Sequence, residues 1–333
     1  MAEKKSKGSG KLLKFILIPE VTSIVTVLAV IIIATAINPI FLRRENLLTL
    51  TSSLIASWGI LAIGEALLIM SGGLDVSMGN IMTFAAMMFC LLARSGCPLW
   101  LCIVVVFAIA IAMELVNGLL ILKFGVAPFI ATMSMQFVGE GLSNVVNYGA
   151  DLKYTMGASD VFIKFNDFFS ARPLGLSIGA IVFIVLIFVT QFMLKKTAFG
   201  RQLYAVGDNS RVVRVAGIRV VRVRTLCFII AGFLIGLTAL LWVGYYGGCT
   251  PTQGNPWTFI TIAAAAMGGI SLRGGSGSMF GLFFGVVLMG LVYNLITLLG
   301  IDSNFQNIFI GCFLALSVVL DTVRREKTLG KNI

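Results

Sequence analysis

Histidine is absent from this sequence, and charged residues account for only 12% of its 333 positions. The missing histidine argues against zinc sites of the usual Cys/His kind and against catalysis through a histidine base. The six cysteines fall mainly in or beside long apolar runs, where a thiol behaves as a small buried apolar side chain. They are Cys90, Cys97, Cys102, Cys227, Cys249 and Cys312. We therefore predict no metal site.

A nucleotide-binding motif is also missing. The glycine-rich stretch LRGGSGSMFG at residues 272–281 lacks both the lysine and the spacing of a phosphate-binding loop. Catalytic residues for an enzyme are not evident either. We therefore predict that this chain is not an enzyme and that it holds no cofactor.

What the sequence has in abundance is apolar residues, which make up 58% of it and give a mean hydropathy of +1.01. A bilayer core about 30 Å thick takes ~20 apolar residues per helix, and lipid cannot satisfy an open backbone. We therefore predict an all-α integral membrane protein with about ten transmembrane helices. The predicted spans are residues 21–42, 47–73, 76–93, 97–122, 124–146, 173–194, two within 225–272, 279–301 and 305–320.

The positions of lysine and arginine predict the orientation. Threading ten spans with the N-terminus inside places most of the 25 basic residues on the cytoplasmic side, so both termini are predicted to be cytoplasmic. Residues 1–14 would form a basic N-terminal tail, 15–322 the transmembrane domain and 323–333 a C-terminal tail. The net charge of +11 is then a topology signal, and it does not indicate nucleic-acid binding.

Two polar segments are longer than simple linkers. Residues 148–172 mix charges with phenylalanines and predict a short amphipathic element on the outer face. Residues 195–224 form a basic loop on the inner face, in which residues 208–210 are good N-cap types and Gly217 is typical of a helix C-terminus. The intervening turns predict a short helix with Val212 and Val213 on one side. Taken alone, this loop is equally typical of a docking surface and of a positively charged anchor.

Acidic residues interrupt the apolar runs at Glu65, Glu114 and Glu140. A charge at the centre of a membrane helix costs ~2.5 to 3.5 kcal/mol on insertion scales, so such residues are functional candidates, although neutral hydrogen-bonded acids are the alternative. Asp75 is the most suggestive, because it follows a Gly-Gly pair within residues 71–79. A second Gly-Gly pair lies within residues 267–275. Paired breaks of this kind indicate a central pathway, whereas close helix packing is the plain alternative.

Four ordered strings carry a family resemblance. SGGLDVSMGN (71–80), APFIATMSM (127–135), KTAFGRQLYAVGDNSRVVRVAGI (196–218) and MGGISLRGGSGSMFG (267–281) resemble the permease subunits of bacterial sugar importers of the ATP-binding-cassette (ABC) class. The pattern is similar to that of ribose, xylose, arabinose and galactose permeases of the second carbohydrate-uptake subfamily. The resemblance implies a type II-like importer permease in the bacterial inner membrane.

The resemblance also implies partners and site residues. It implies ATP-binding-cassette ATPase subunits that hydrolyse ATP, a second permease subunit, and an extracytoplasmic solute-binding protein. The residues expected to couple the chain to the ATPase are Gly200, Arg201, Ala205, Gly207, Asn209, Arg211, Val212, Val213 and Gly217. Those expected along the substrate pathway are Asp75, Ser77, Asn80, Phe129, Thr132 and Thr261.

Two departures from the family pattern bear on the solute. An acidic pair is usual ahead of the G-G-x-S-L-x-G-G motif, and this chain has Phe259, Ile260 and Thr261 there. The arginine that usually follows the F-I-A-T segment is replaced, and Glu140 lies near that place. The main interpretation is an importer permease for a sugar or related small polar solute. The alternatives are an ion-coupled carrier that uses Glu65, Asp75, Glu114 and Glu140, and a membrane scaffold that transports nothing.

Overall fold

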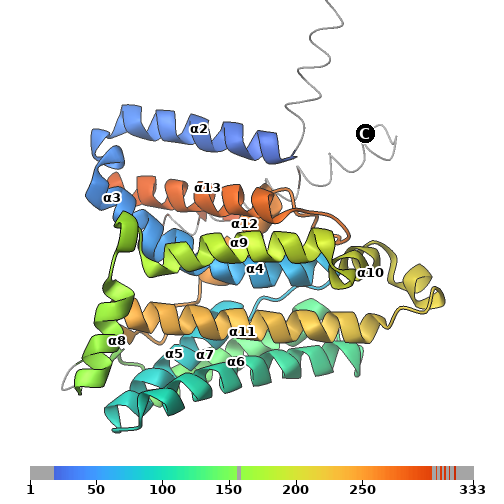
Figure 1. The fold of residues 1–333 in the computed structure, drawn as a ribbon, viewed down its shortest axis with the longest axis horizontal. Coiled ribbons are helices and arrows are strands. Elements are labelled where there is room, and N and C mark those ends of the chain that lie inside the picture. Colours follow the sequence, from blue (N-terminus) through green and yellow to red (C-terminus); the bar gives the residue numbers. More distant parts are fainter. Residues whose placement is uncertain are drawn as a thin grey trace, which may run out of the picture.

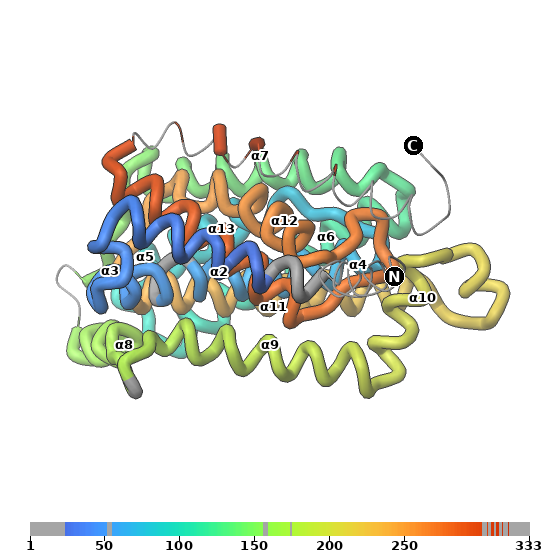
Figure 2. Tube along the Cα trace, turned by 90° about the horizontal axis from the view of Figure 1, so that it is seen from above, coloured from blue at the N-terminus to red at the C-terminus, as the bar shows by residue number. Residues whose placement is uncertain are grey.

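A computed structural model describes residues 19–155 and 159–301, together with scattered helical positions between 305 and 319. Figure 1 shows helices lying side by side in an elongated bundle, with α10 projecting from one end and α8 crossing the other. The tube in Figure 2 gives the same arrangement from above. The predicted tails, and most of the last predicted span, lie outside the described residues.

The described helices follow the predicted order of apolar runs. Their bounds are α2 (Pro19–Ile37), α3 (Arg44–Thr49), α4 (Ala56–Met70), α5 (Met78–Arg94), α6 (Leu99–Leu122), α7 (Pro128–Val146), α8 (Asp160–Ser170), α9 (Ile178–Lys196), α10 (Ala198–Val215), α11 (Val220–Tyr246), α12 (Trp257–Met267) and α13 (Met279–Leu298). Among the described residues, α6, α9, α11 and α13 are long and apolar enough to cross a membrane. Shorter apolar helices accompany them, which confirms a helical membrane protein at this coarse level.

Several predicted spans are broken rather than continuous. The run predicted at 47–73 is α3 and α4 joined through a π-helical turn, Leu50–Ile55. The run predicted at 21–42 ends as a helix at Ile37, and a 3₁₀ turn, Pro39–Leu42, follows it. The two helices predicted within 225–272 are unequal, because α11 has 27 residues and α12 only 11.

A small antiparallel sheet is the exception to the all-helical prediction. Strands β1 (Leu152–Lys153) and β2 (Gly248–Cys249) pair, with Leu152 opposite Cys249. The pairing follows the end of α11, where Gly247 adopts a left-handed conformation with φ of 69° and stops the helix. The sheet ties the long loop after α7 to the turn that leads into α12.

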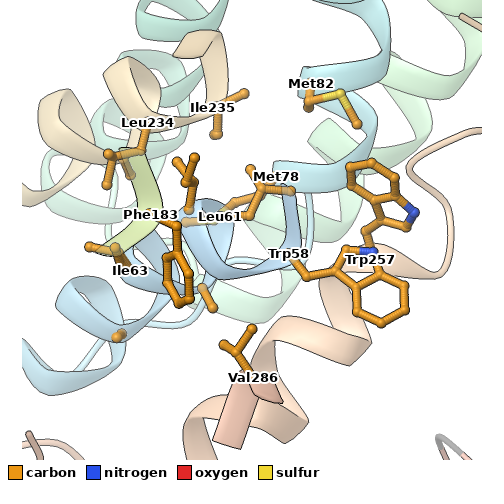
Figure 3. Packing of buried hydrophobic residues seen from close by; sticks show 14 of the residues in the cluster. Trp58, Leu61, Ile63, Met78, Met82, Phe183, Leu234, Ile235, Trp257 and Val286 are labelled. Carbon is orange, nitrogen blue, oxygen red and sulfur yellow. The ribbon is translucent and has the colours of Figure 1, made fainter. Parts of the chain in front are cut away.

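The core is centred on α4 and α11. Every residue of α4 is buried, and Figure 3 shows Trp58, Leu61 and Phe183 among the side chains that fill the interior. Small residues let the helices approach closely: a Cβ on Gly232 of α11 would come within 2.7 Å of Ile111 in α6. Association of helices in lipid depends on such close packing more than on the hydrophobic effect.

Helix α8 is the amphipathic element predicted within 148–172. Its Phe165 stacks on Phe89 of α5 with ring centroids 5.3 Å apart, and Phe162 packs edge-on to the same ring. The helix is therefore fixed across the end of the bundle opposite α10 (Figure 1).

Candidate functional site

Helix α10 consists of two pieces that meet at a kink. Asn209 has φ of −153° and ψ of 92°, which is not helical. Its Oδ1 accepts hydrogen bonds from the backbone N of Arg211 at 3.1 Å and of Val212 at 3.2 Å. Asn209 is therefore the N-cap of the second piece. Asparagine is favoured at this position because its side-chain oxygen accepts hydrogen bonds from the first turn of the helix.

The second piece also has a defined end. Gly217 has φ of 84°. Its N donates to Arg214 O at 3.1 Å, and the N of Ile218 donates to Val213 O at 3.2 Å. These two bonds form a Schellman motif, which needs a left-handed residue and favours glycine there. The short helix predicted from the cap residues and Gly217 is confirmed.

The surface of this short helix differs from the predicted one. Val212 is 63% exposed and Val215 is 90% exposed, whereas Val213 is only 8% exposed and belongs to the hydrophobic core. Residues three apart share a helix face, whereas adjacent residues point in directions about 100° apart. The exposed apolar ridge is therefore Val212 with Val215, and the predicted pairing of Val212 with Val213 is wrong. Arg211 and Arg214 flank the ridge and are exposed.

A hollow of about 590 Å³ lies next to the ridge. It is lined by residues that follow the short helix, including Ile218, Arg219, Val221 and Arg222. Val221 is 54% exposed. The end of the bundle thus presents an apolar ridge and an apolar hollow, both surrounded by arginines.

The first piece of α10 faces the bundle. Thr197 caps it by accepting from Gly200 N at 3.2 Å, and Gly200 and Leu203 are buried. A Cβ on Gly200 would overlap the carbonyl oxygen of Leu194. Gly200 and Gly207 were predicted as parts of a docking surface, but they lie against the chain itself because only glycine permits this backbone approach. Arg201 is exposed and Ala205 is half-buried.

Gly207 lies where both glycine-rich breaks meet. A Cβ on it would overlap Met70 O and come within 2.5 Å of Gly275 N. Gly275 N donates to Met70 O at 3.0 Å, and a Cβ on Gly274 would lie 3.1 Å from the Cα of Gly72. We call Gly72, Gly207, Gly274 and Gly275 the glycine junction.

Two long side chains brace the glycine junction. Arg224, near the start of α11, donates from Nε to Ser71 O at 3.1 Å. Tyr204 in α10 donates its hydroxyl to Gly277 O at 2.8 Å. Burial raises the pKa of the Tyr204 phenol, which favours the protonated donor. A displacement of α10 therefore reaches both breaks through direct contacts.

The helices α5 and α12 begin beside each other within the bundle. A Cβ on Gly79 or on Gly254 would overlap the carbonyl oxygen of the other residue. Gly79 N donates to Thr258 Oγ1 at 3.1 Å, and Gly254 N donates to Thr83 Oγ1 at 2.8 Å. Interrupted helices whose ends meet inside a membrane bundle are typical of transport pathways.

A buried polar network fixes the segment between α4 and α5. Asp75 Oδ1 accepts from the backbone N and from the Oγ of Ser77, both at 2.6 Å, and Asn117 Nδ2 donates to Asp75 Oδ2 at 3.2 Å. Asp75 N donates to Glu65 Oε1 at 3.3 Å, and Glu114 lies beside Asp75. All five side chains are buried.

Glu65, Asp75 and Glu114 are far apart in the sequence, but the fold brings them together. The chain doubles back after Met70, which returns Asp75 to the level of Glu65, and α6 brings Glu114 to the same place. Within the described residues, no group of His, Cys, Asp and Glu is arranged to hold a metal ion. Asp75 is 0% exposed, so in this structure it is enclosed by protein and does not line an open cavity.

The remaining predicted pathway residues divide between this region and the surface. Thr132 Oγ1 accepts from Val76 N at 3.2 Å, which joins α7 to the buried network. Asn80 and Thr261 are buried near the starts of α5 and α12. Phe129 is 50% exposed at the beginning of α7 and is not buried with the others. Glu140 lies apart from the network and accepts from Asn255 Nδ2 at 3.2 Å.

Apolar helices, paired breaks and a projecting capped helix together define a multi-pass membrane protein of the permease type. The family model described as "branched-chain amino acid transport system / permease component" matches residues 46–318, and the chain belongs to this family.

Named relatives are similar over most of their length. The chain is 32% identical over 291 residues to the ribose import permease protein RbsC of Bacillus subtilis, covering 87% of this chain and 89% of the relative. It is 28% identical over 310 residues to RbsC of Haemophilus influenzae, covering 93% and 95%. It is 29% identical over 282 residues to the fructose import permease protein FrcC of Rhizobium meliloti, covering 82% and 77%. None of the solved structures matches the chain.

The comparisons favour one of the three interpretations made from the sequence. The relatives are import permeases, and the self-sufficient ion-coupled carrier finds no support among them. Sequence reasoning missed Asn117, Tyr204 and Arg224, because an amide, a phenol and an arginine near a helix start carry no signal of their own.

Proposed function

We propose that this chain is the membrane-spanning permease subunit of an ATP-driven importer for a sugar or a related small polar solute. The names of the relatives support this solute class, because they are permeases for ribose import and fructose import. The solute would arrive on an extracytoplasmic solute-binding protein. ATP would be hydrolysed by separate ATP-binding-cassette subunits, with no cofactor on this chain.

The observation that carries the proposal is the two-piece construction of α10. Its second piece exposes Val212 and Val215 at the end of the bundle, while the first piece reaches the glycine junction through Gly207. A capped, rigid helix can pass on a push from a partner that binds the exposed ridge. The segment 195–224 would then be the coupling element, with Asn209 and Gly217 fixing its shape.

The topology proposed from the sequence fits this arrangement. About ten spans, with both termini cytoplasmic, would place α10 on the cytoplasmic side of the bacterial inner membrane and α8 outside. A second permease subunit, identical or related, would complete the pathway. The ATPase would meet α10, and the binding protein would meet the end of the bundle that holds α8.

The pathway proposed for the solute runs beside the starts of α5 and α12. There the backbone leaves helical geometry at residues 71–77 and 250–256. Non-helical backbone at membrane depth is tolerated only where it is buried in protein or lines a water-filled cavity. Asp75, Ser77, Asn80, Thr132 and Thr261 surround this region, and opening it would require α10 to move the glycine junction.

Reconstitution tests the proposal directly. The chain, its ATPase and its binding protein would be placed in proteoliposomes, and uptake of labelled ribose, fructose, xylose, arabinose and galactose would be measured. We expect uptake of at least one sugar that needs ATP and the binding protein and that persists after an ionophore collapses proton and sodium gradients. Uptake that needs a gradient and not ATP would support the ion-coupled carrier instead.

A further inference from the structure

A polar strip on α7 is separate from the buried network around Asp75. Gln136, Glu140 and Asn144 recur at every fourth position, so their side chains leave the same side of the helix. All three are half-buried. Asn255, in the turn before α12, lies across the strip and donates from Nδ2 to Glu140 Oε1 at 3.2 Å. We call these four residues the α7 strip.

The α7 strip lies next to the interrupted helices. Asn80, near the start of α5, donates from Nδ2 to the backbone O of Gln136 at 3.2 Å. Asn255 directly follows Gly254, which fits against the backbone of Gly79. The strip therefore follows the seam between α7 and the turn that enters α12, and this seam continues to the place where α5 and α12 begin.

Hydrogen-bonding capacity remains unused along the strip. Gln136 Oε1 and Asn255 Oδ1 are buried atoms without a hydrogen-bond partner in the protein. Such atoms are rare in native proteins, and each asks for an explanation such as a ligand or a water. A carboxyl and several amides on a membrane helix also face water or protein rather than lipid. The seam therefore offers unpaired hydrogen-bond acceptors to a polar molecule.

The hydrogen-bonding groups of the α7 strip indicate which kind of molecule would bind there. Gln136 Oε1, Asn255 Oδ1 and the Glu140 carboxyl are all acceptors, so they suit a molecule with several adjacent hydroxyl donors. The carboxyl would repel an anion, because like charges interact unfavourably at short range. An apolar solute would leave the acceptors unpaired, which costs binding energy.

We propose that the α7 strip is a hydroxyl-recognition site for an uncharged polyhydroxy solute on its way through the permease. This inference rests on the proposed function and adds the residues that bind the hydroxyl groups of the solute. Glu140 is the central group, since it is held by Asn255 and lies between Gln136 and Asn144. Gln136 and Asn255 accept from neighbouring hydroxyls of the same solute.

The first test measures whether the seam is accessible to water and whether sugar occupies it. Single cysteines would replace Gln136 and Glu140 in a cysteine-free chain, with Ser134→Cys and Leu142→Cys as controls on the opposite side of α7. In the reconstituted complex, a charged methanethiosulfonate reagent should label positions 136 and 140 faster than the controls. The sugar that the wild type imports should slow the labelling at 136 and 140 alone.

The second test measures transport. At saturating loaded binding protein, Glu140→Leu should lower the maximal uptake rate about tenfold or more, because a group that pairs substrate hydroxyls is lost. Glu140→Gln keeps an acceptor oxygen and should retain most of the rate, as should Ser134→Leu. Recovery of folded complex by size-exclusion chromatography would be checked for each variant.

Equal labelling at all four positions, or wild-type uptake by Glu140→Leu, would overturn the α7 strip as a recognition site. Wild-type uptake that depends on ATP would still support the proposed function in that case. Loss of ATP-dependent sugar uptake in the wild type itself would instead reject the proposed function, so the two failures are distinguishable.

Discussion

Gly207 lies so close to Met70 that a Cβ on the glycine would overlap the carbonyl oxygen at the end of α4. The same glycine also lies against Gly275 in the second break. One position in α10 therefore contacts both interrupted segments at once. In the proposed importer, this contact carries the motion of α10 to the pathway.

Replacing Gly207 with alanine should disturb this contact. The added methyl group meets rigid backbone rather than a flexible side chain, and overpacking of this kind typically costs ~1 to 3 kcal/mol. We expect a lower thermal midpoint for the purified permease and weaker solute-stimulated ATP hydrolysis. Gly141→Ala in α7 is the matched control, because a Cβ there meets nothing within 4 Å. Equal stability and coupling in both variants would show that the junction tolerates displacement.

Removing the cap at the kink of α10 should loosen its second piece. Asn209→Ala loses the acceptor for Arg211 N and Val212 N, and loss of such a cap costs ~0.5 to 2 kcal/mol. Asn209→Asp keeps the acceptor and should behave as wild type. Limited trypsin digestion at Arg211 and Arg214 would report the change, with faster cleavage expected for the alanine variant only. Identical digestion of all three proteins would mean that the cap does not hold this helix.

Gly217→Val should have a related effect through the other end of the same helix. A left-handed residue with φ of 84° accommodates a β-branched side chain poorly, so the Schellman motif would be strained. A Cβ here meets no neighbouring atom within 4 Å, so any loss reports the backbone and not a clash. Coupled uptake should fall while the rest of the bundle keeps its thermal midpoint. Full uptake by Gly217→Val would remove the argument for a rigid coupling helix.

Ser77 should become accessible only when the transporter is working. The residue is 0% exposed in this structure and is hydrogen-bonded to Asp75. In a cysteine-free background, Ser77→Cys should resist a small permeant thiol reagent at rest and react during ATP hydrolysis with loaded binding protein. Val106→Cys, which is buried in α6 away from the glycine junction, serves as a control for general unfolding. Failure to react in every nucleotide state would place Ser77 outside the pathway.

The parts of the fold that could be predicted from the sequence are those with local physical causes. Apolar runs indicated the helices, because burial in lipid requires ~20 such residues. The capped helix after Asn209 was predictable, since its N-cap and its left-handed glycine depend on adjacent residues. The polar turn that separates α11 from α12 was predictable in the same way, whereas the left-handed Gly247 that ends α11 was found only in the structure.

The parts that could not be predicted depend on where the chain returns in space. Asp75 meets Glu114 only because the segment after Met70 doubles back and α6 crosses it, and no spacing in the sequence encodes that approach. The burial of Val213 could not be predicted either, because it depends on how the short helix packs against the rest of the bundle. The seam beside Glu140 could not be predicted without the position of Asn255, which lies 115 residues away along the chain.

The central claim is that the exposed ridge of α10 binds the ATPase. Fully burying a valine contributes ~1.5 to 3 kcal/mol, whereas an exposed ion pair contributes ~0 to 1 kcal/mol. Val212 and Val215 should therefore matter more than the arginines beside them. Val213 is unsuitable for this test, since an aspartate there would disrupt the core of the protein itself.

The most direct measurement compares two double variants. One carries Val212→Asp together with Val215→Asp, and the other carries Arg211→Gln together with Arg214→Gln. Both would be reconstituted with the ATPase and binding protein, and ATPase recovery would be measured beside solute-stimulated ATP hydrolysis. The account predicts that the valine variant stays folded but loses the ATPase or its stimulation, while the arginine variant keeps most of both. Full recovery and full stimulation in the valine variant would contradict it and leave the segment 195–224 as a positively charged anchor.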